Sequence, residues 1–285
     1  MHRRLGGGVV ACGVLVAALT VGTAGVPGSG TASDTGSVGV SNAAPAAHLR
    51  VTTAVSVASP SYAVAAKPLA GLTIALDPGH QLGNATHPRQ INRKVWVGLW
   101  KICNTTGTAT NRGYPEATFN FSVALRLRAA LRSLGARVVM TRYTNTTRSW
   151  GPCIDYRGRF GKAARAVLKV SIHADGAPSR DRGFHIITPK LRRGYTDDIY
   201  AASRRLGLAM RRGMVSGGIP LSNYIRRGWS VRGDQGTLNM SDIPTIIVET
   251  GNMRNARDAA LEVSSAGQRR YAYALLRGIR LYLRR

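Results

Sequence analysis

Short apolar runs recur along the C-terminal three quarters of the chain. They are rich in Val, Ile and Leu, and apolar residues follow one another rather than alternating cleanly with polar ones. Continuous runs of this kind are typical of strands covered on both faces, as in a parallel sheet between two layers of helices. The predicted strands are 72–76 (LTIAL), 137–141 (RVVMT), 167–172 (VLKVSI), 184–188 (FHIIT) and 245–249 (TIIVE).

Segments with helical periodicity separate these runs. The first of them ends in Gly135, a residue suited to a helix C-cap. Strands that alternate with helices indicate a single three-layer α/β domain, in which a mostly parallel sheet carries helices on both faces. Ligands bind such sheets beyond the carboxyl ends of the strands, so functional side chains are expected there. The predicted helices are 116–135, 156–166, 197–214 and 266–283.

The N-terminal quarter differs in composition from the rest of the chain. Residues 1–27 contain two arginines, then an apolar run and small residues, the layout of a secretory signal peptide; an uncleaved membrane anchor is the alternative. Residues 28–68 consist largely of Ala, Ser, Thr, Gly and Val, which predicts a low-complexity leader or flexible linker. We therefore expect the folded domain to span 69–285 and the protein to be secreted, to the periplasm or cell wall.

The charge balance is strongly basic. The chain holds 40 Lys and Arg against 13 Asp and Glu, a formal net charge of +27. This excess indicates an anionic partner, and for an exported protein the phosphate- and carboxylate-bearing polymers of the cell envelope fit best. The alternative is that the arginines only keep the domain soluble. Nucleic acid is not expected, because the arginines are scattered through the predicted helices and no recognised binding module frames them.

Cysteine usage adds one constraint. After the leader the chain has only Cys103 and Cys153. An even pair in an exported protein favours a disulfide, whereas cysteine zinc sites need closely spaced pairs, which this sequence lacks. The two cysteines lie in irregular segments, 81–113 and 145–156, which a bridge would tie together.

Three tryptophans, Trp96, Trp100 and Trp150, lie in the same two segments. Structureless segments longer than about 12–15 residues are uncommon in compact domains and are usually functional or constrained. The indoles either line the rim of a ligand site or pack the long segment against the body of the domain. The sequence leaves both interpretations open.

Three residues with catalytic chemistry stand at the ends of predicted strands. His80 follows the first strand through Asp-Pro-Gly, His173 comes directly after 167–172, and Glu249 closes 245–249. A parallel sheet would gather these side chains at one edge. Each has a structural alternative, since a lone histidine after a strand is often a hydrogen-bonded turn residue.

Glu116 opens a predicted helix directly after Pro115. Its interaction with the helix dipole, about 0.3–1 kcal/mol, is enough to explain a glutamate at this position. Taken jointly, however, two imidazoles and a carboxylate are the ligand set of a catalytic zinc with an open fourth position, and a further carboxylate can serve as general base. The compact His-Glu-x-x-His signature is absent, so such ligands would have to come from distant segments.

Three further polar residues lie near these positions. Asp77 either orients His80 from behind or caps the Pro-Gly turn. His87 lies in the loop after the first strand and belongs to no strand end, so it is left out of the ligand set. His185 lies inside a predicted strand and is expected to be a strand residue rather than part of a cleft.

Four segments of the sequence together resemble a known family. They are IALDPGHQLG, EATFNFSVALRLRAALRSLGARVVMTR, RGRFGKAARAVLKVSIHADGAPSRDRGFHIIT and IPTIIVETGNMRN, and the similarity covers nearly all of residues 70–285 in order. The chain resembles the zinc-dependent N-acetylmuramoyl-L-alanine amidases of the amidase_3 group of peptidoglycan hydrolases. This implies a twisted, mostly parallel sheet and cleavage of the amide between N-acetylmuramic acid and L-alanine.

The resemblance also implies roles for single residues. His80, Glu116 and His173 resemble the Zn²⁺ ligands of the family, and Glu249 resembles its catalytic glutamate. One region departs from the family pattern: the first motif often continues as His-Gly-Gly with an acidic residue soon after, whereas this chain has HQLGNATHPRQ and a longer loop. The substrate preference of that region is therefore not carried over.

Two other classes of function share some of these features. A secreted zinc peptidase acting on stem peptides would need the same metal chemistry. A non-catalytic basic cell-wall-binding protein would explain the charge but would leave the four segments unexplained. We expect Zn²⁺ as cofactor, peptidoglycan or muropeptides as substrate, and a monomer.

Overall fold

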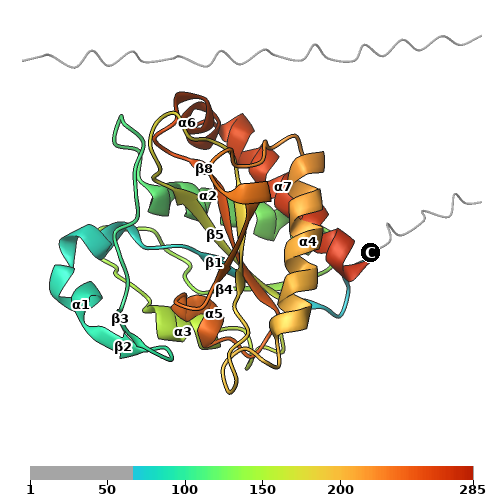
Figure 1. The fold of residues 1–285 in the computed structure, drawn as a ribbon. Helices are drawn as coiled ribbons and strands as arrows, with labels where there is room; N and C mark the ends of the chain where they lie inside the picture. The colour runs from blue at the N-terminus through green and yellow to red at the C-terminus, as the bar shows by residue number, and fades with distance from the viewer. Residues whose placement is uncertain (1–66, 285) are drawn as a thin grey trace, which may run out of the picture. The chain divides into compact units, whose positions relative to one another are not determined.

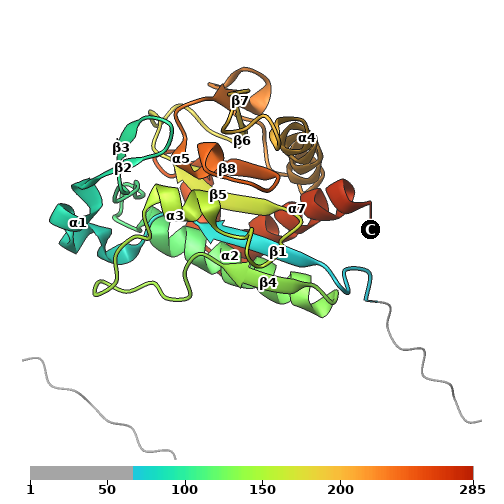
Figure 2. The same cartoon turned by 90° about the horizontal axis from the view of Figure 1, so that it is seen from below.

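The computed structural model describes residues 67–284, which belong to one compact unit. The predicted signal peptide (1–27) and nearly all of the predicted linker (28–68) lie outside the described residues. A six-stranded sheet forms the centre of the domain, with helices packed around it (Figures 1 and 2). Among the described helices, none combines the length and the apolar character needed to span a bilayer.

The sheet confirms the predicted α/β class. Four of its five strand pairs are parallel, and only the β6–β8 pair is antiparallel. Only nine residues, 176–184, separate β5 from β6, too few for the crossover of a dozen or more residues that a parallel return needs. The strand order is β4 (Arg137–Met140), β1 (Thr73–Pro78), β5 (Lys169–Asp175), β8 (Thr245–Asn252), β6 (His185–Pro189) and β7 (Trp229–Arg232).

Helices cover both faces of the sheet, but unequally. The main core lies between the sheet and three long helices, and alternate strand residues such as Ile74, Val170 and Val248 point into it. The intervening residues point to the other face, where Ile187 and Ile247 pack on a short helix. The long helices are α2 (Glu116–Ser133), α4 (Tyr200–Ser216) and α7 (Ser265–Leu283); the shorter ones are α3 (Ile154–Arg159), α5 (Gly236–Asn239) and α6 (Ala256–Val263).

The predicted helix 156–166 is wrong over its second half, because α3 ends at Arg159. Gly161 has a φ of +103°, which no α-helix accommodates. The buried ammonium group of Lys169 donates hydrogen bonds to the carbonyl oxygens of Arg157 (2.7 Å) and Phe160 (3.1 Å), which lie at this helix end. A charge from β5 therefore satisfies carbonyls that a longer helix would have used internally.

The long segment 81–113 is not structureless. It forms η1 (Leu82–Thr86), α1 (Pro88–Asn92) and an antiparallel pair of strands, β2 (Lys94–Trp96) and β3 (Trp100–Ile102).

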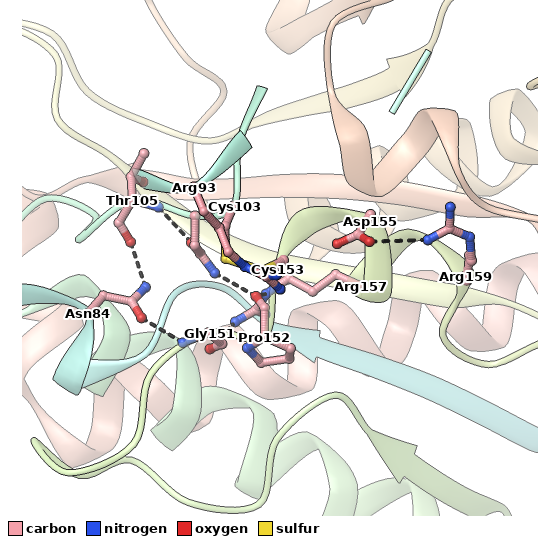
Figure 3. The surroundings of a disulfide bond; sticks show 11 residues. Asn84, Arg93, Cys103, Thr105, Gly151, Pro152, Cys153, Asp155, Arg157 and Arg159 are labelled. Carbon is pink, nitrogen blue, oxygen red and sulfur yellow. Dashed lines mark hydrogen bonds and ion pairs between the residues drawn. A yellow bond between two sulfur atoms is a disulfide. The ribbon is translucent and has the colours of Figure 1, made fainter. Parts of the chain in front are cut away.

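The predicted disulfide between Cys103 and Cys153 is confirmed, and it joins the end of β3 to the residue before α3 (Figure 3). The bridge packs with Val95 and Val97 in a small core of its own. Trp96 and Trp100 are 48% and 64% exposed and contact each other edge-on, so they do not pack the segment onto the domain.

Candidate metal centre

The structure brings three of the predicted site residues together. His80 follows β1, Glu116 is the first residue of α2, and His173 lies on β5. Their donor atoms all lie within 4.8 Å of one another. Nε2 of His80 lies 3.3 Å from one carboxylate oxygen of Glu116, and Nδ1 of His173 lies 3.1 Å from the other. Two imidazole nitrogens and a carboxylate thus converge on one point, as expected for a metal site.

Backbone conformation explains the Pro-Gly-His sequence after β1. His80 has a φ of 56°, in the left-handed region that bulky residues seldom adopt. Gly79 lies directly against the imidazole of His173, where an added Cβ would come within 2.3 Å of the ring. The turn therefore needs a glycine for close approach, and the strained residue that follows, His80, is the first candidate ligand.

Arg157 holds this turn in place from α3. Its buried guanidinium pairs with Asp77 and donates to the carbonyl oxygens of Pro78 (2.8 Å), His80 (2.7 Å) and Gly151 (3.0 Å). These bonds fix the backbone on both sides of the first ligand. A planar donor group with five N–H bonds suits this role, because it satisfies several carbonyls at once.

A second buried arginine, Arg142, supports the turn from the other side. It donates to the carbonyl oxygens of Pro78 (3.1 Å), Gly79 (3.2 Å) and Ala117 (2.8 Å). Since Ala117 directly follows Glu116, one side chain ties together the segments of the first two candidate ligands.

Asp77 acts on the turn through Arg157. Its two carboxylate oxygens accept hydrogen bonds from Thr141 (2.6 Å) and Ser171 (2.7 Å), which belong to the neighbouring strand segments. Burial alone would raise the pKa of Asp77, but the pairing with Arg157 and these hydroxyl groups lower it to about 2. Asp77 thus anchors the arginine instead of contacting the imidazole of His80 or capping the turn.

Hydrogen bonds orient the candidate ligand atoms themselves. Nδ1 of His80 lies 3.0 Å from the carbonyl oxygen of Thr105, which directs Nε2 toward Glu116. The Glu116 carboxylate accepts from the amides of Thr108 (2.9 Å) and Ala174 (3.2 Å) and from the side chain of Asn120 (3.0 Å). Supporting contacts of this kind fix the ring tautomer and the carboxylate orientation in metal sites.

The electrostatics of the three side chains follow from burial and mutual contact. Burial opposes charge on Glu116, but the adjacent imidazoles of His80 and His173 hold the pKa of Glu116 well below its usual value. The same contact outweighs burial at His80 and raises its pKa, whereas at His173 burial dominates and lowers the pKa. Glu116 is therefore ionised at neutral pH, and a carboxylate between two imidazoles suits a divalent cation.

Glu249 lies beside this group. In the sheet it is the register neighbour of His173 on one side and of His185 on the other, so all three point to the same face. One of its carboxylate oxygens, Oε2, is buried without a hydrogen-bond partner among the described residues. Burial and the nearby carboxylates of Glu116 and Asp175 raise its pKa well above the usual value.

A cleft of about 240 Å³ is lined by the two candidate histidine ligands, His80 and His173, and by Glu249. Its walls come from the disulfide-linked segment, represented by Lys101 and Ile102, and from α5, represented by Gly236 and Thr237. The exposed indoles of the same segment are not among the lining residues, so the interpretation of Trp96, Trp100 and Trp150 as rim contacts gains no support.

Two further histidines, His87 and His185, lie among the described residues. His87 hydrogen-bonds within its own loop, to the carbonyl oxygen of Gly83 (2.8 Å), and is not part of the ligand group. His185 lies on β6 and is 4% exposed; burial lowers its pKa to about 4.

Sequence reasoning missed the two buried arginines, Arg157 and Arg142. Nothing in an isolated arginine marks it among 40 basic residues. Their role depends on where the backbone carbonyls of a distant turn point, which only the folded chain defines.

Fold and site together define a class: an α/β protein with two histidines and a glutamate placed where they could hold one metal ion, and a second carboxylate, that of Glu249, beside them, as in metal-dependent hydrolases. Residues 74–280 match the Amidase_3 family, described as N-acetylmuramoyl-L-alanine amidase, and the chain belongs to this family. It is accordingly an amidase of peptidoglycan.

Known proteins agree with this assignment. The chain is 41% identical over 221 residues to the N-acetylmuramoyl-L-alanine amidase Rv3717 of Mycobacterium tuberculosis, covering 75% of this chain and 88% of the relative. The crystal structure of the N-acetylmuramyl-L-alanine amidase Ami1 of Mycobacterium smegmatis is 38% identical, with a TM-score of 0.70 over 75% of this chain and 98% of that one. The apo Ami1 of Mycobacterium abscessus is 37% identical, with the same TM-score, over 75% of this chain and all of that one.

Proposed function

We propose that His80, Glu116 and His173 bind Zn²⁺ and that Glu249 is the general acid–base residue for cleavage of the amide between the lactyl group of N-acetylmuramic acid and L-alanine. The observation that carries the proposal is the convergence of three donor atoms within 4.8 Å, beside a carboxylate that is not part of the group. Borderline-soft imidazole nitrogens combined with one carboxylate oxygen suit zinc better than magnesium or calcium, which prefer oxygen ligands.

The chemistry divides between the cofactor and the chain. When bound, zinc supplies Lewis acidity that polarises a carbonyl and makes water a better nucleophile near neutral pH. Glu249 accepts the proton that water loses as the carbon–oxygen bond forms, and it returns this proton to the nitrogen of L-alanine as the amide bond breaks. The products are the lactyl carboxylate and a peptide with a free amine.

The environment of Glu249 supports this role. A pKa raised by burial and by neighbouring carboxylates makes a glutamate a better proton acceptor than a solvent-exposed one. Its oxygen Oε2 has no hydrogen-bond partner among the described residues, so its acceptor capacity is unused.

Substitutions separate metal binding from proton transfer. Glu249→Gln is expected to keep zinc but lose turnover about 10²- to 10⁴-fold, the usual contribution of a positioned acid–base group. His173→Ala is expected to lose both, because it removes a ligand. His87→Ala is the matched control, since this histidine lies in the loop after His80 but outside the group of candidate ligands. Zinc stoichiometry and muropeptide mass spectrometry measure the two properties, and normal hydrolysis by the Glu249→Gln enzyme would disprove the mechanism.

Product analysis also separates the amidase from a stem-peptide peptidase. An amidase releases intact stem peptides whose L-alanine carries a free amine. A peptidase shortens the peptides and leaves L-alanine attached to the sugar.

A peptidoglycan amidase acts at the cell wall, and we further propose that residues 1–27 direct export there. We also propose that the enzyme acts as a monomer and that nucleic acid is not a partner. Anionic polymers of the envelope are the proposed binding partners of the basic surface, consistent with the net charge of +27.

A further inference from the structure

An open hollow of about 460 Å³ lies on the far edge of the sheet, outside the cleft described above. It is formed by α4, by β7 and by the one-turn helix η2 (Arg226–Gly228) that precedes β7. Figure 2 shows α4 beside the edge of the sheet that β6 and β7 form. Its volume is in the range of small-molecule sites. The lining residues are Arg204, Leu208, Arg211, Arg226, Arg227 and Trp229, and we call this set the arginine hollow.

Helix geometry builds one wall. Arg204, Leu208 and Arg211 stand at positions i, i+4 and i+7 of α4, which places them on one face of the helix. Leu208 is 43% exposed, so this wall presents an apolar surface between two cationic groups.

Trp229 provides a fixed apolar surface. Its ring packs against Gly207 of α4 so closely that an added Cβ would lie 2.7 Å from a ring atom. The ring is half-buried and held by the helix on one side, so it keeps its place without a ligand. A rigid, partly open indole of this kind can accept the apolar face of a sugar ring at little entropic cost.

The arginines of the hollow are not paired with carboxylates of the described residues. Within residues 67–284, none of the four arginines of the hollow forms an ion pair with a carboxylate. Arg211 uses Nε to donate to the carbonyl oxygen of Arg227 (3.0 Å), which ties η2 to α4 through one of the several N–H groups of the guanidinium. Like charges held close together repel one another, and a bound anion relieves that repulsion.

We propose that the arginine hollow binds the sugar-phosphate units of a phosphate-bearing polysaccharide of the cell envelope. Guanidinium groups pair with phosphate oxygens through two parallel N–H bonds, and the apolar face of the sugar packs on Trp229 and Leu208. Neither the ligand group nor Glu249 contributes to the arginine hollow, so this proposal stands independently of the proposed catalytic mechanism.

The test compares two double variants of equal charge. Arg204→Gln with Arg226→Gln removes two cations from the hollow, whereas Arg132→Gln with Arg137→Gln removes two exposed cations from α2 and β4. Binding of a phosphorylated glucan to the full chain is measured by titration calorimetry, with unphosphorylated glucan and inorganic polyphosphate as the comparison polymers.

We expect the hollow variant to lose affinity for phosphorylated glucan about tenfold or more, and the control variant less than about threefold. Trp229→Phe keeps an apolar ring but reduces its area. It should therefore lower the affinity for phosphorylated glucan more than the affinity for polyphosphate. Hydrolysis of soluble muropeptides should be unchanged in the hollow variant.

Three results would overturn the proposal. Equal losses in the two double variants would mean that binding follows net charge rather than a site. If polyphosphate binds as tightly as phosphorylated glucan, and Trp229→Phe does not change the affinity for either polymer, the sugar makes no contribution to binding. Tight, variant-sensitive binding to vesicles of phosphatidylglycerol without binding to phosphorylated glucan would assign the hollow to a membrane surface instead.

Discussion

Glu262 offers a quantitative test of the electrostatics of this fold. Its carboxyl group is fully buried in the last turn of α6, and neither oxygen has a hydrogen-bond partner among the described residues. Gly251 and Tyr271 enclose it, since a Cβ at Gly251 would lie 2.8 Å from its Oε1 and 3.1 Å from the Tyr271 hydroxyl. Burial, followed by the negative charge of Asp258, raises the pKa of Glu262 from 4.5 to about 8.

The sign of the effect on stability follows from proton binding. Between pH 4.5 and 8 the unfolded chain releases this proton while the folded protein keeps it. The stabilisation is therefore complete below about pH 4.5 and is lost as the pH rises toward 8. Each pH unit between these two values corresponds to about 1.4 kcal/mol, so the upper limit is about 5 kcal/mol over the whole range, and about 3–4 kcal/mol between pH 5 and pH 8.

The substitution Glu262→Gln removes the titration and keeps the size of the side chain. Urea unfolding at pH 5, 6, 7 and 8, with a chelator present so that metal release does not contribute, gives the free energy of unfolding of both proteins. We expect the wild-type value to fall relative to that of the variant by about 3–4 kcal/mol across this range. Asp198→Asn, an exposed residue just before α4, is the control and should follow the wild type.

A constant offset between wild type and Glu262→Gln from pH 5 to pH 8 would refute the reasoning. Contributions from all other groups are shared by both proteins and cancel in the difference. A constant offset could then arise only if the buried carboxyl ionised with its ordinary pKa.

Two further predictions concern the scaffold of the site. Arg157→Met should lower the free energy of unfolding by about 3–5 kcal/mol, because it leaves the buried Asp77 carboxylate unpaired. It should also weaken zinc binding, because the turn that carries His80 loses its support. Urea unfolding and competitive zinc titration measure the two effects, and wild-type stability together with wild-type zinc affinity would contradict this role. Replacing Cys103 and Cys153 by alanine should cost about 4 kcal/mol at most, from the entropy of a closed loop with a sequence separation of 50, measured as a shift in the urea midpoint relative to the oxidised wild type.

Much of the sheet could be predicted from the chain alone, because buried strands must be apolar on both faces. All five predicted strands are present, and the helices at 116–135, 197–214 and 266–283 correspond to α2, α4 and α7. The failures have different causes. The helix predicted at 156–166 stops early because Lys169, on a strand, takes up its terminal carbonyls. β7 was missed because Trp229–Arg232 lies at the sheet edge, where one face is exposed and the apolar signal is weak.

Part of the candidate site could also be predicted from the sequence. His80, His173 and Glu249 were found because parallel strands bring their carboxyl ends to one edge, and a strand end can be seen in a sequence. Glu116 could be predicted as a candidate ligand only together with the two histidines, because the helix dipole alone explains a glutamate at a helix start. Only the fold shows that donor atoms of His80, Glu116 and His173 lie within 4.8 Å of one another.

The inventory and the periodicity can be read from the chain alone: an α/β domain, histidine and glutamate at strand ends, a pair of cysteines after the leader and a large excess of arginine. These properties depend on neighbours along the chain. The tertiary structure alone decided which arginines are buried against the His80 turn, which four gather around Trp229, and which carboxyl group is enclosed without a partner. Those outcomes depend on distances between segments far apart in sequence, and the physical consequences of a charge follow from its surroundings rather than from its position in the chain.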